Sequence, residues 1–387
     1  MIYYRPIARQ GRRPPGAMSL AGGWCWFSHA ERLERGQVPV VVPVAQVPGD
    51  WLTALTRPRM PLGGEHLTPN PSPTGEGGAE RHRKPPPLRL QSGAGGEVFA
   101  ASLATVDSPA LAGIPMNRPR LMGILNVTPD SFSDGGLFND PTAALAQAQA
   151  MWAAGAAILD IGGESTRPGA ELVDVATEIR RTAPVIAALH AEMPDLPISI
   201  DTRKAAVATT ALAAGAGMVN DVSALTHDPA MAAVVAKAGV PLCLMHAQGT
   251  PDSMQHDPHY GDVLLDVYDV LAARLAVAMA AGIAQTRIVI DPGIGFGKTP
   301  AHNLALIRGI ALFHGLGCPV LLGASRKGFI GSLSGVADPV ARMPGSVAVA
   351  LAAVAQGVQV LRVHDVAATR QALDLWQAIA EPEGHDL

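Results

Sequence analysis

Polar and ionisable side chains recur in this chain where short apolar runs end. The clearest case is Leu121–Gly136, in which an apolar run ends at Asn126 and continues directly into a loop that contains Asp134. Pro129 interrupts regular structure there, and the glycines at the end of the segment supply a hinge. A buried strand that delivers an amide and acidic side chains into a loop is typical of an active site.

The same arrangement repeats along the rest of the chain. The apolar runs are Leu121–Val127, Ala157–Ile161, Pro197–Asp201, Met218–Val222, Pro241–His246, Arg287–Asp291, Pro319–Ala324 and Val360–Val366. Their ends carry Asn126, Asp160, Asp201, Asn220, Met245-His246, Asp291, Ser325-Arg326-Lys327, and Arg362 with His364. Because buried polar groups cost free energy unless each finds a partner, we interpret this set as one convergent site.

The residue types of this set indicate the chemistry of its ligand. Carboxylates and amides suit a flat heterocycle that presents several N–H donors, and cations suit phosphate or carboxylate groups. The acceptors and the amide are Asp160, Asp201, Asn220 and Asp291, and the cations are Arg167, Lys327, Arg362 and His364. Asn126 is a neutral oxygen ligand for Mg²⁺ bound to a diphosphate, since Mg²⁺ favours few protein ligands together with substrate phosphates. The set therefore predicts a nitrogen heterocycle with a phosphate-type leaving group.

Alanine-rich segments with helical periodicity alternate with these runs, and one of the helices they predict spans Ala301–His314. Five of them end in a glycine, as expected where a helix stops in the left-handed conformation: Gly155, Gly215, Gly239, Gly282 and Gly357. Eight strand–helix units in about 260 residues predict an α/β protein with a (β/α)₈ TIM barrel. A doubly wound sheet is the weaker alternative, because Thr128–Ser131 is not a glycine-rich nucleotide loop.

Composition limits the remaining possibilities. The chain has 387 residues, 48% of them hydrophobic and 16% charged, with a net charge of −4. We therefore expect a large core and no nucleic-acid partner. Three cysteines without metal-type spacing suggest ordinary thiols in a reducing compartment. Neither a signal peptide nor a membrane span is recognisable, so we expect a cytoplasmic protein that does not enter membranes.

Residues 1–118 form an N-terminal extension of different character, and the predicted barrel occupies residues 119–381. From about 61 to 97 the extension is rich in Pro, Gly, Ser and charge, which predicts disorder. Residues 19–58 carry enough aromatic and aliphatic side chains for a small unit of strand and turn. The sequence leaves open whether that unit packs on the barrel, and whether it is a partner-binding module or a tolerated insertion.

Two apparent motifs are rejected. Gly293–Thr299 ends in Gly-Lys-Thr like a phosphate-binding loop, but Pro292 stands where that motif needs its first glycine. It also follows the sixth strand rather than the first strand of a nucleotide fold. The histidines His246, His256 and His259 lack the spacing or the cysteine partners of a zinc site.

Long segments of the chain resemble dihydropteroate synthase, a pterin-binding family. The matching segments, in order, are Leu121–Gly136, Gly162–Ala170, Asn220–Ala224, Leu244–Pro251, Asp291–Lys298, Gly323–Gly331, Arg342–Ala350 and Arg362–Val366. The resemblance runs from about Arg118 to Ile379 and implies a (β/α)₈ barrel, usually a homodimer, that is the target of sulfonamides. It implies that 6-hydroxymethyl-7,8-dihydropterin diphosphate and 4-aminobenzoate condense to 7,8-dihydropteroate, with release of diphosphate.

The resemblance also assigns roles to individual residues. The implied pterin pocket comprises Asp160, Asp201, Asn220, Met245, Asp291, Phe296, Gly323 and Lys327. The implied diphosphate site comprises Asn126, which also binds Mg²⁺, with Arg167, Arg362 and His364. Phe132, Pro168 and Ser325 would contact the aminobenzoate, and Asp134 and Thr166 would act with Arg167 as the leaving group departs. The family implies an SN1-like course, which the residues alone do not separate from SN2.

Three rival functions remain. A methyltetrahydrofolate-dependent methyltransferase would share the Asp and Asn residues that surround a pterin, but it has no use for a diphosphate site. A Schiff-base aldolase using Lys327 fits the acids less well. A non-catalytic pterin-binding paralogue would be expected to lose Asp134, Thr166 or Arg167, and all three are present.

Overall fold

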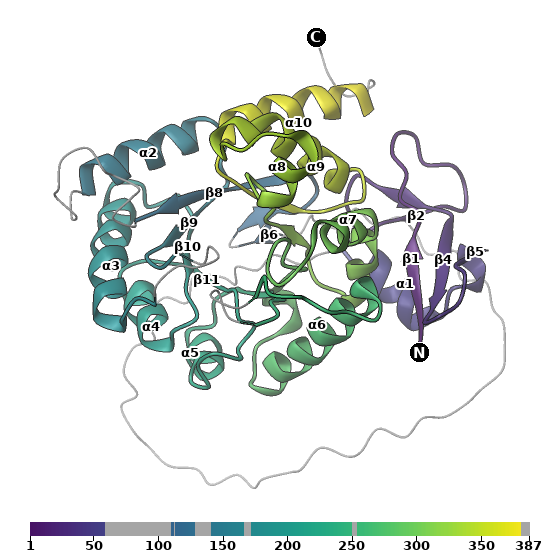
Figure 1. The fold of residues 1–387 in the computed structure, drawn as a ribbon, viewed down its shortest axis with the longest axis horizontal. Helices are drawn as coiled ribbons and strands as arrows, with labels where there is room; N and C mark the ends of the chain where they lie inside the picture. The colour runs from purple at the N-terminus through teal and green to yellow at the C-terminus, as the bar shows by residue number, and fades with distance from the viewer. Residues whose placement is uncertain (59–109, 112, 128–140, 166–171, 250–253, 381–387) are drawn as a thin grey trace, which may run out of the picture. The chain divides into compact units, whose positions relative to one another are not determined.

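The computed structural model describes residues 1–58, 110–111, 113–127, 141–165, 172–249 and 254–380. Its main element is a parallel eight-stranded sheet in the order β13-β12-β11-β10-β9-β8-β15-β14. A parallel bridge between Ile290 and Val320 joins the two outer strands and closes the sheet into a barrel (Figure 1). The strands are β8 (Arg120–Asn126), β9 (Ile158–Gly162), β10 (Ile198–Asp201), β11 (Met218–Asp221), β12 (Leu242–Met245), β13 (Ile288–Asp291), β14 (Leu321–Leu322) and β15 (Val360–Val363). The predicted (β/α)₈ barrel is confirmed.

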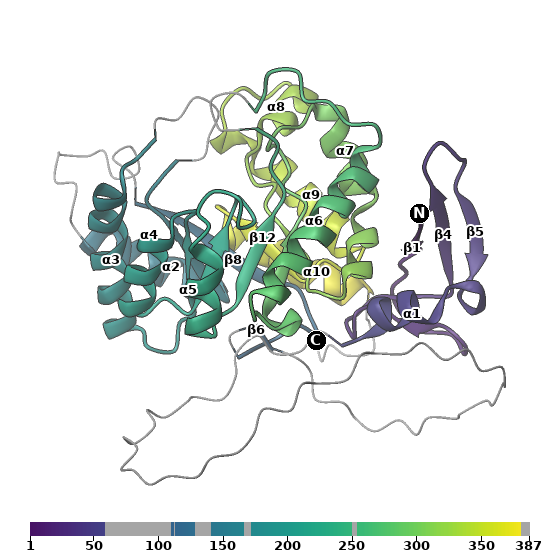
Figure 2. The same ribbon diagram turned by 90° about the horizontal axis from the view of Figure 1, so that it is seen from below.

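Helices surround the strands, as Figures 1 and 2 show. They are α2 (Pro141–Ala153), α3 (Val175–Glu192), α4 (Ala205–Ala213), α5 (Met231–Ala238), α6 (Val263–Ala280), α7 (Pro300–Arg308), α8 (Gly328–Ser334), α9 (Met343–Val354) and α10 (Val366–Ala380). The five glycines expected to end helices all have positive φ.

Two helical details differ from the prediction. The helix expected over Ala301–His314 ends at Arg308, and a 3₁₀ segment, η4 (Ile310–Leu316), follows it. Gly309 lies at the break, where a Cβ atom would come within 2.5 Å of the Leu264 side chain. This glycine weakens the helix and admits the close approach of α6. The short helix α8 was not predicted, because Gly328–Ser334 is too short to show a periodic signal.

The barrel interior has an apolar lower layer and a polar upper layer. The lower layer comprises Met122, Ile158, Met218, Cys243, Val289, Leu321 and Val360, with Met116 packed beneath. Side chains on a strand alternate between its two faces, so the residue two positions after each member of the lower layer also points into the barrel. On five strands that position holds Asp160, Asn220, Met245, Asp291 and Arg362. The alternation therefore places the predicted site residues together at the carboxyl ends of the strands.

The first 58 residues form a small β unit in the same compact unit as the barrel. It contains the antiparallel sheet β1 (Ile2–Pro6), β4 (His29–Glu34) and β5 (Val40–Pro43), the ribbon β2 (Met18–Ser19) and β3 (Trp26–Phe27), η1 (Val44–Gln46) and α1 (Gly49–Thr56). A further ribbon, β6 (Ala110–Leu111) and β7 (Ile114–Pro115), precedes β8, and η3 (Gln285–Arg287) and η5 (Val340–Arg342) complete the assigned elements.

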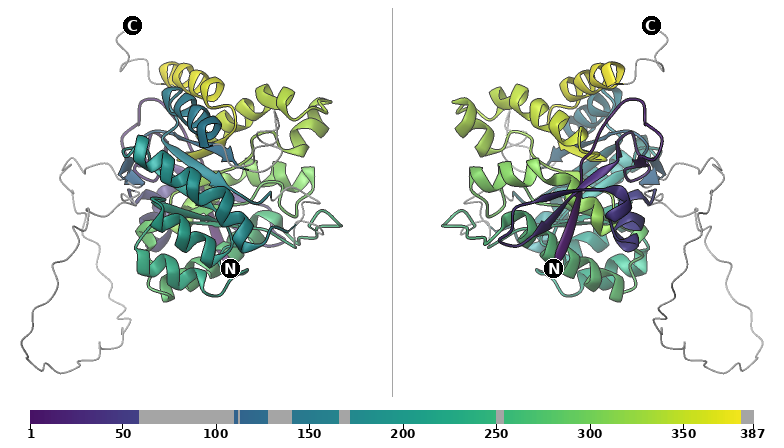
Figure 3. Two further views of the ribbon diagram at one scale, coloured as in Figure 1. Left: turned by 90° about the vertical axis from the view of Figure 1, so that its left-hand side faces the viewer. Right: turned by 90° about the vertical axis from the view of Figure 1, so that its right-hand side faces the viewer.

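This N-terminal unit packs on the side of the barrel, as the purple strands in the right-hand view of Figure 3 show. The Tyr3 hydroxyl donates to Asp269 of α6 at 2.9 Å, and Arg35 forms ion pairs with Asp266 and Asp269. The Trp51 ring stacks on Tyr268, with 5.7 Å between ring centroids. The unit therefore extends the core of the barrel on this side.

We expect Trp51→Ala to lower the free energy of unfolding by about 2–3 kcal/mol, because the indole fills the space over Gly315 and Tyr268. Urea denaturation followed by circular dichroism measures the loss. Trp152→Ala is the matched control, since that side chain is 40% exposed. Equal losses in the two variants would show that packing of Trp51 on the barrel contributes no more to stability than an exposed tryptophan does.

Candidate active site

Four side chains from four strands form a buried network at the mouth of the barrel. Asp160 accepts a hydrogen bond from Asn220 Nδ2 at 2.9 Å and one from Arg362 Nε at 2.5 Å. The same guanidinium donates from Nη2 to Asp201 at 2.7 Å. Asp160 is fully buried, and its Oδ1 atom has no hydrogen-bond partner among the described residues. The network thus joins residues up to 202 positions apart and leaves an acceptor for a ligand.

Burial governs the electrostatics of this network. It raises the pKa of the Asp201 carboxyl, an effect that Arg362 opposes and Asp160 reinforces. Burial alone would lower the pKa of Arg362, but the carboxylates of Asp160 and Asp201 hold it above its ordinary value. One cation therefore balances two carboxylates inside the barrel.

A second group surrounds Asp291 at the end of β13. Asp291 is buried and accepts a hydrogen bond from the backbone of Gly293 through Oδ1 at 2.7 Å. Its Oδ2 lies 3.6 Å from the position of a Cβ atom on Gly323, so the carboxylate borders the end of β14. The Lys327 ammonium lies 3.9 Å from the centroid of the Phe296 ring. Burial raises the pKa of Asp291 to about 6, while the Gly293 hydrogen bond and Lys327 oppose the rise.

The end of β8 places Asn126 beside this network. A Cβ atom on Gly162 would lie 3.6 Å from Asn126 Oδ1 and 3.7 Å from Asp201 Oδ2, so both oxygens border the same space. Within the described residues, no three His, Cys, Asp or Glu side chains are grouped to hold a metal ion. An amide oxygen at an open mouth nevertheless fits Mg²⁺, which takes most of its ligands from substrate phosphates and water.

The turns after β14 and β15 lie together. Ser325 Oγ is 3.0 Å from His364 Nδ1 and accepts from the His364 backbone at 3.2 Å. Arg326, which has a φ of 59°, donates to Asp365 from Nε at 3.0 Å and from Nη2 at 2.5 Å. The paired turns hold Ser325 and His364 at the mouth.

Five other predicted site residues lie outside the described residues: Phe132, Asp134, Thr166, Arg167 and Pro168.

A buried ionic cluster beside β9 and β10 was not predicted from the sequence. Glu164 forms ion pairs with Arg203 and Lys204, and Lys204 also pairs with Glu178 at 2.5 Å. Glu164 also accepts from the Val173 backbone at 3.0 Å. The available signal was a charged residue two positions after each of two strands: Glu164 after β9, and Arg203, followed by Lys204, after β10.

Glu164→Gln should lower the free energy of unfolding by at least about 2 kcal/mol, because two cations would lose a buried partner. Denaturant titration tests this expectation. The exposed Glu192→Gln, at the end of α3, is the control with the same chemical change. Equal stability of both variants would mean that the cluster contributes nothing net to folding.

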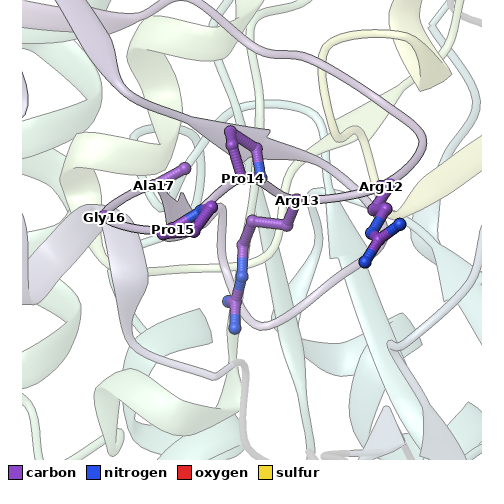
Figure 4. Close-up of a pocket in the computed structure, with 6 residues that line it drawn as sticks. All are labelled: Arg12, Arg13, Pro14, Pro15, Gly16 and Ala17. Carbon is purple, nitrogen blue, oxygen red and sulfur yellow. The ribbon is translucent and has the colours of Figure 1, made fainter.

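Other features of the structure lie apart from this mouth. A hollow of about 590 Å³ is lined by residues 12–17 of the N-terminal unit, with Arg12 and Arg13 extending from it (Figure 4). The neighbouring Gly11 approaches Ala380, the last residue of α10, rather than a strand end.

Among the described helices, none combines the length and apolar character needed to cross a membrane.

Fold and site together define a (β/α)₈-barrel protein with a buried network of carboxylates, an amide and a guanidinium at the mouth of the barrel. The family model described as "Pterin binding enzyme" matches residues 122–364. A dihydropteroate synthase of Neisseria meningitidis serogroup C is 48% identical over 269 residues, which cover 69% of this chain and 94% of the relative. The Escherichia coli K12 dihydropteroate synthase is 44% identical over 265 residues, covering 68% and 93%. The chain therefore belongs to the dihydropteroate synthase family of pterin-binding enzymes.

Solved structures agree with this assignment. Dihydropteroate synthase of Xanthomonas albilineans with 4-aminobenzoic acid is 50% identical, with a TM-score of 0.65 and coverage of 69% of this chain and 94% of that one. The same organism's enzyme with 7,8-dihydropteroate is 47% identical, with a TM-score of 0.63 and coverage of 69% and 95%. The Yersinia pestis enzyme in a sulfonamide complex is 47% identical, with a TM-score of 0.65 and coverage of 69% and 96%.

Proposed function

We propose that this chain is a transferase that joins (7,8-dihydropterin-6-yl)methyl diphosphate to 4-aminobenzoate, giving 7,8-dihydropteroate and diphosphate in folate biosynthesis. The observation that carries the proposal is the convergence of Asp160, Asp201, Asn220 and Asp291 with Arg362 at one end of the barrel. Relatives at 44–48% identity that bear this name support it.

The pterin is bound by the buried acids. Its 2-amino group and N3 carry adjacent N–H donors, which one carboxylate can accept together, and Asp291 is the carboxylate we assign to them. The free Oδ1 of Asp160 and the Asn220 amide serve the other edge of the ring. Lys327 donates to the pterin carbonyl or a ring nitrogen, and Phe296, Met245 and Gly323 border the ring.

Bond cleavage separates charge. The C–O bond to diphosphate breaks with its electron pair going to the leaving oxygen, so positive charge develops on the pterin methylene. Arg362 and His364 stabilise the departing anion, together with Arg167 of the second loop. Mg²⁺, when bound through Asn126 and the diphosphate, would neutralise part of that negative charge.

The second substrate then completes the reaction. The aminobenzoate nitrogen attacks the methylene carbon, the new C–N bond forms, and the nitrogen loses a proton. We assign Ser325, whose hydroxyl lies 3.0 Å from His364 Nδ1, to donate to the aminobenzoate carboxylate. Phe132 and Pro168 are proposed to flank its ring, while Asp134 and Thr166 act near the breaking bond. Excluding water protects the cation from hydrolysis.

The test is diphosphate release by the purified chain with the pterin diphosphate, 4-aminobenzoate and Mg²⁺, each omitted in turn. We expect release only with the complete mixture, with dihydropteroate formed in equal amount. Binding of pterin without turnover would identify the non-catalytic paralogue. Methyl transfer from methyltetrahydrofolate would identify the methyltransferase instead.

Four further properties form part of the proposal. Mg²⁺ is the expected cofactor, and inhibition by sulfonamides is expected because a relative forms such a complex. We also propose a homodimer in the cytoplasm. Sedimentation of the purified protein measures the oligomeric state, and cell fractionation the location.

A further inference from the structure

The Gly-Lys-Thr segment rejected as a phosphate-binding loop packs against the end of the neighbouring strand. A Cβ atom on Gly293 would lie 1.8 Å from the His246 carbonyl oxygen, and one on Gly297 would lie 2.4 Å from that of Gln248. Both glycines also have positive φ, near 65–70°. Glycine is required here because two backbones meet, the loop after β13 and the segment after β12.

Lys298 is buried at this junction, with 2% of its surface exposed. Its Nζ atom lies 2.9 Å from His246 Nδ1, 3.4 Å from the His246 carbonyl oxygen and 3.0 Å from the Phe296 carbonyl oxygen. Its hydrogen-bond partners are a ring nitrogen and two carbonyls, so this amine joins two backbone segments. Thr299, the last residue of the apparent motif, caps α7 by accepting from the His302 backbone.

Both joined segments carry residues of the pterin pocket. Phe296, whose carbonyl accepts from Lys298, supports the Lys327 ammonium on its ring. Met245 directly precedes His246. We propose that Lys298 is a positioning residue of the pterin pocket. Its amine holds Phe296, and through Phe296 the Lys327 side chain, in a fixed position relative to Met245 and Asp291. This inference rests on the proposed function, since it assigns the pocket to a pterin.

Burial and neighbouring charges set the protonation states of Lys298 and His246. Burial lowers the pKa of Lys298 to about 7, the Asp291 carboxylate opposes this shift, and Lys327 adds to it. Burial and Lys298 together lower the pKa of His246 to about 3, so the imidazole is neutral near pH 7. Tyr260, whose ring contacts His246 and His302, has a pKa raised to about 12 by burial and by Asp266. The amine can therefore donate to both carbonyls whether charged or neutral.

The experiment compares Lys298→Met with wild type in the full chain. Calorimetry measures the dissociation constant for 6-hydroxymethylpterin, and steady-state kinetics measures the KM for 4-aminobenzoate. We expect Lys298→Met to raise the pterin dissociation constant at least about 10-fold, because the hydrogen bonds that hold the Phe296 and His246 segments together are lost. The aminobenzoate KM should change less than about threefold, because no contact to that substrate is assigned to Lys298. A purely structural role would reduce the folded fraction and leave the affinity of folded protein unchanged.

Lys237→Met is the matched control, since Lys237 is exposed on α5, and it should bind pterin as wild type does. If Lys298→Met does not fold, a comparison of His246→Asn with His246→Leu tests the proposal instead. Asn keeps a side-chain acceptor for the Lys298 amine, and Leu does not. We expect tighter pterin binding with Asn than with Leu. Wild-type affinity in folded Lys298→Met, or equal affinities in the His246 pair, would overturn the proposal. No pterin binding by wild type would instead overturn the proposed function.

Discussion

Asp291→Asn should weaken pterin binding by about 30-fold or more. The carboxylate is buried at the mouth, and an amide in its place offers one acceptor where the pterin presents two donors. A loss of about 2 kcal/mol or more is expected for a buried charge-assisted pair, which corresponds to that factor. Titration calorimetry with 6-hydroxymethylpterin measures it.

The same residue predicts the pH dependence of binding. Because the pKa of Asp291 is about 6, the carboxylate is protonated below that pH and cannot accept both donors. Wild-type affinity should therefore rise as pH increases through about 6 and then level off, and this step should vanish in Asp291→Asn. The exposed Asp195→Asn should keep both the affinity and the step. A folded Asp291→Asn protein with wild-type affinity would remove Asp291 from the pocket.

Arg362→Met should cause the largest combined loss of stability and activity. It would leave Asp160 and Asp201 buried without their cation, which costs about 3–5 kcal/mol when one partner of a buried pair is removed. Turnover should fall at least about 100-fold, because the departing diphosphate also loses a cation. Thermal melting and single-turnover kinetics measure the two effects.

Two comparisons separate these roles of Arg362. The double variant Asp160→Asn with Arg362→Met should regain part of the lost stability, because it removes one stranded carboxylate, but not the lost turnover. The diphosphate substrate should lose more affinity than free pterin, as expected for a cation that serves both the pocket and the leaving group. Equal losses for the two ligands, or full activity in folded Arg362→Met, would place the anion site elsewhere.

Local sequence was enough to predict the barrel. Each strand is a short apolar run followed by a polar residue, and glycines with positive φ end the helices as expected. These signals depend on neighbours within a few positions. They weaken where the element is very short, as at β14 and α8, or where a glycine divides a helix, as at Gly309.

The sequence alone determined which residues face the mouth, since alternation along each strand fixes the face on which a side chain lies. Only the tertiary structure decided their partners. Arg362 pairs with carboxylates 202 and 161 positions away, and Lys298 bridges two segments 52 positions apart. Periodicity reports the conformation of a segment, whereas hydrogen-bond and ion-pair partners depend on how strands are ordered around the barrel. For that reason Arg362 could be predicted as a cation of the mouth, but its position between Asp160 and Asp201 could be found only in the folded chain.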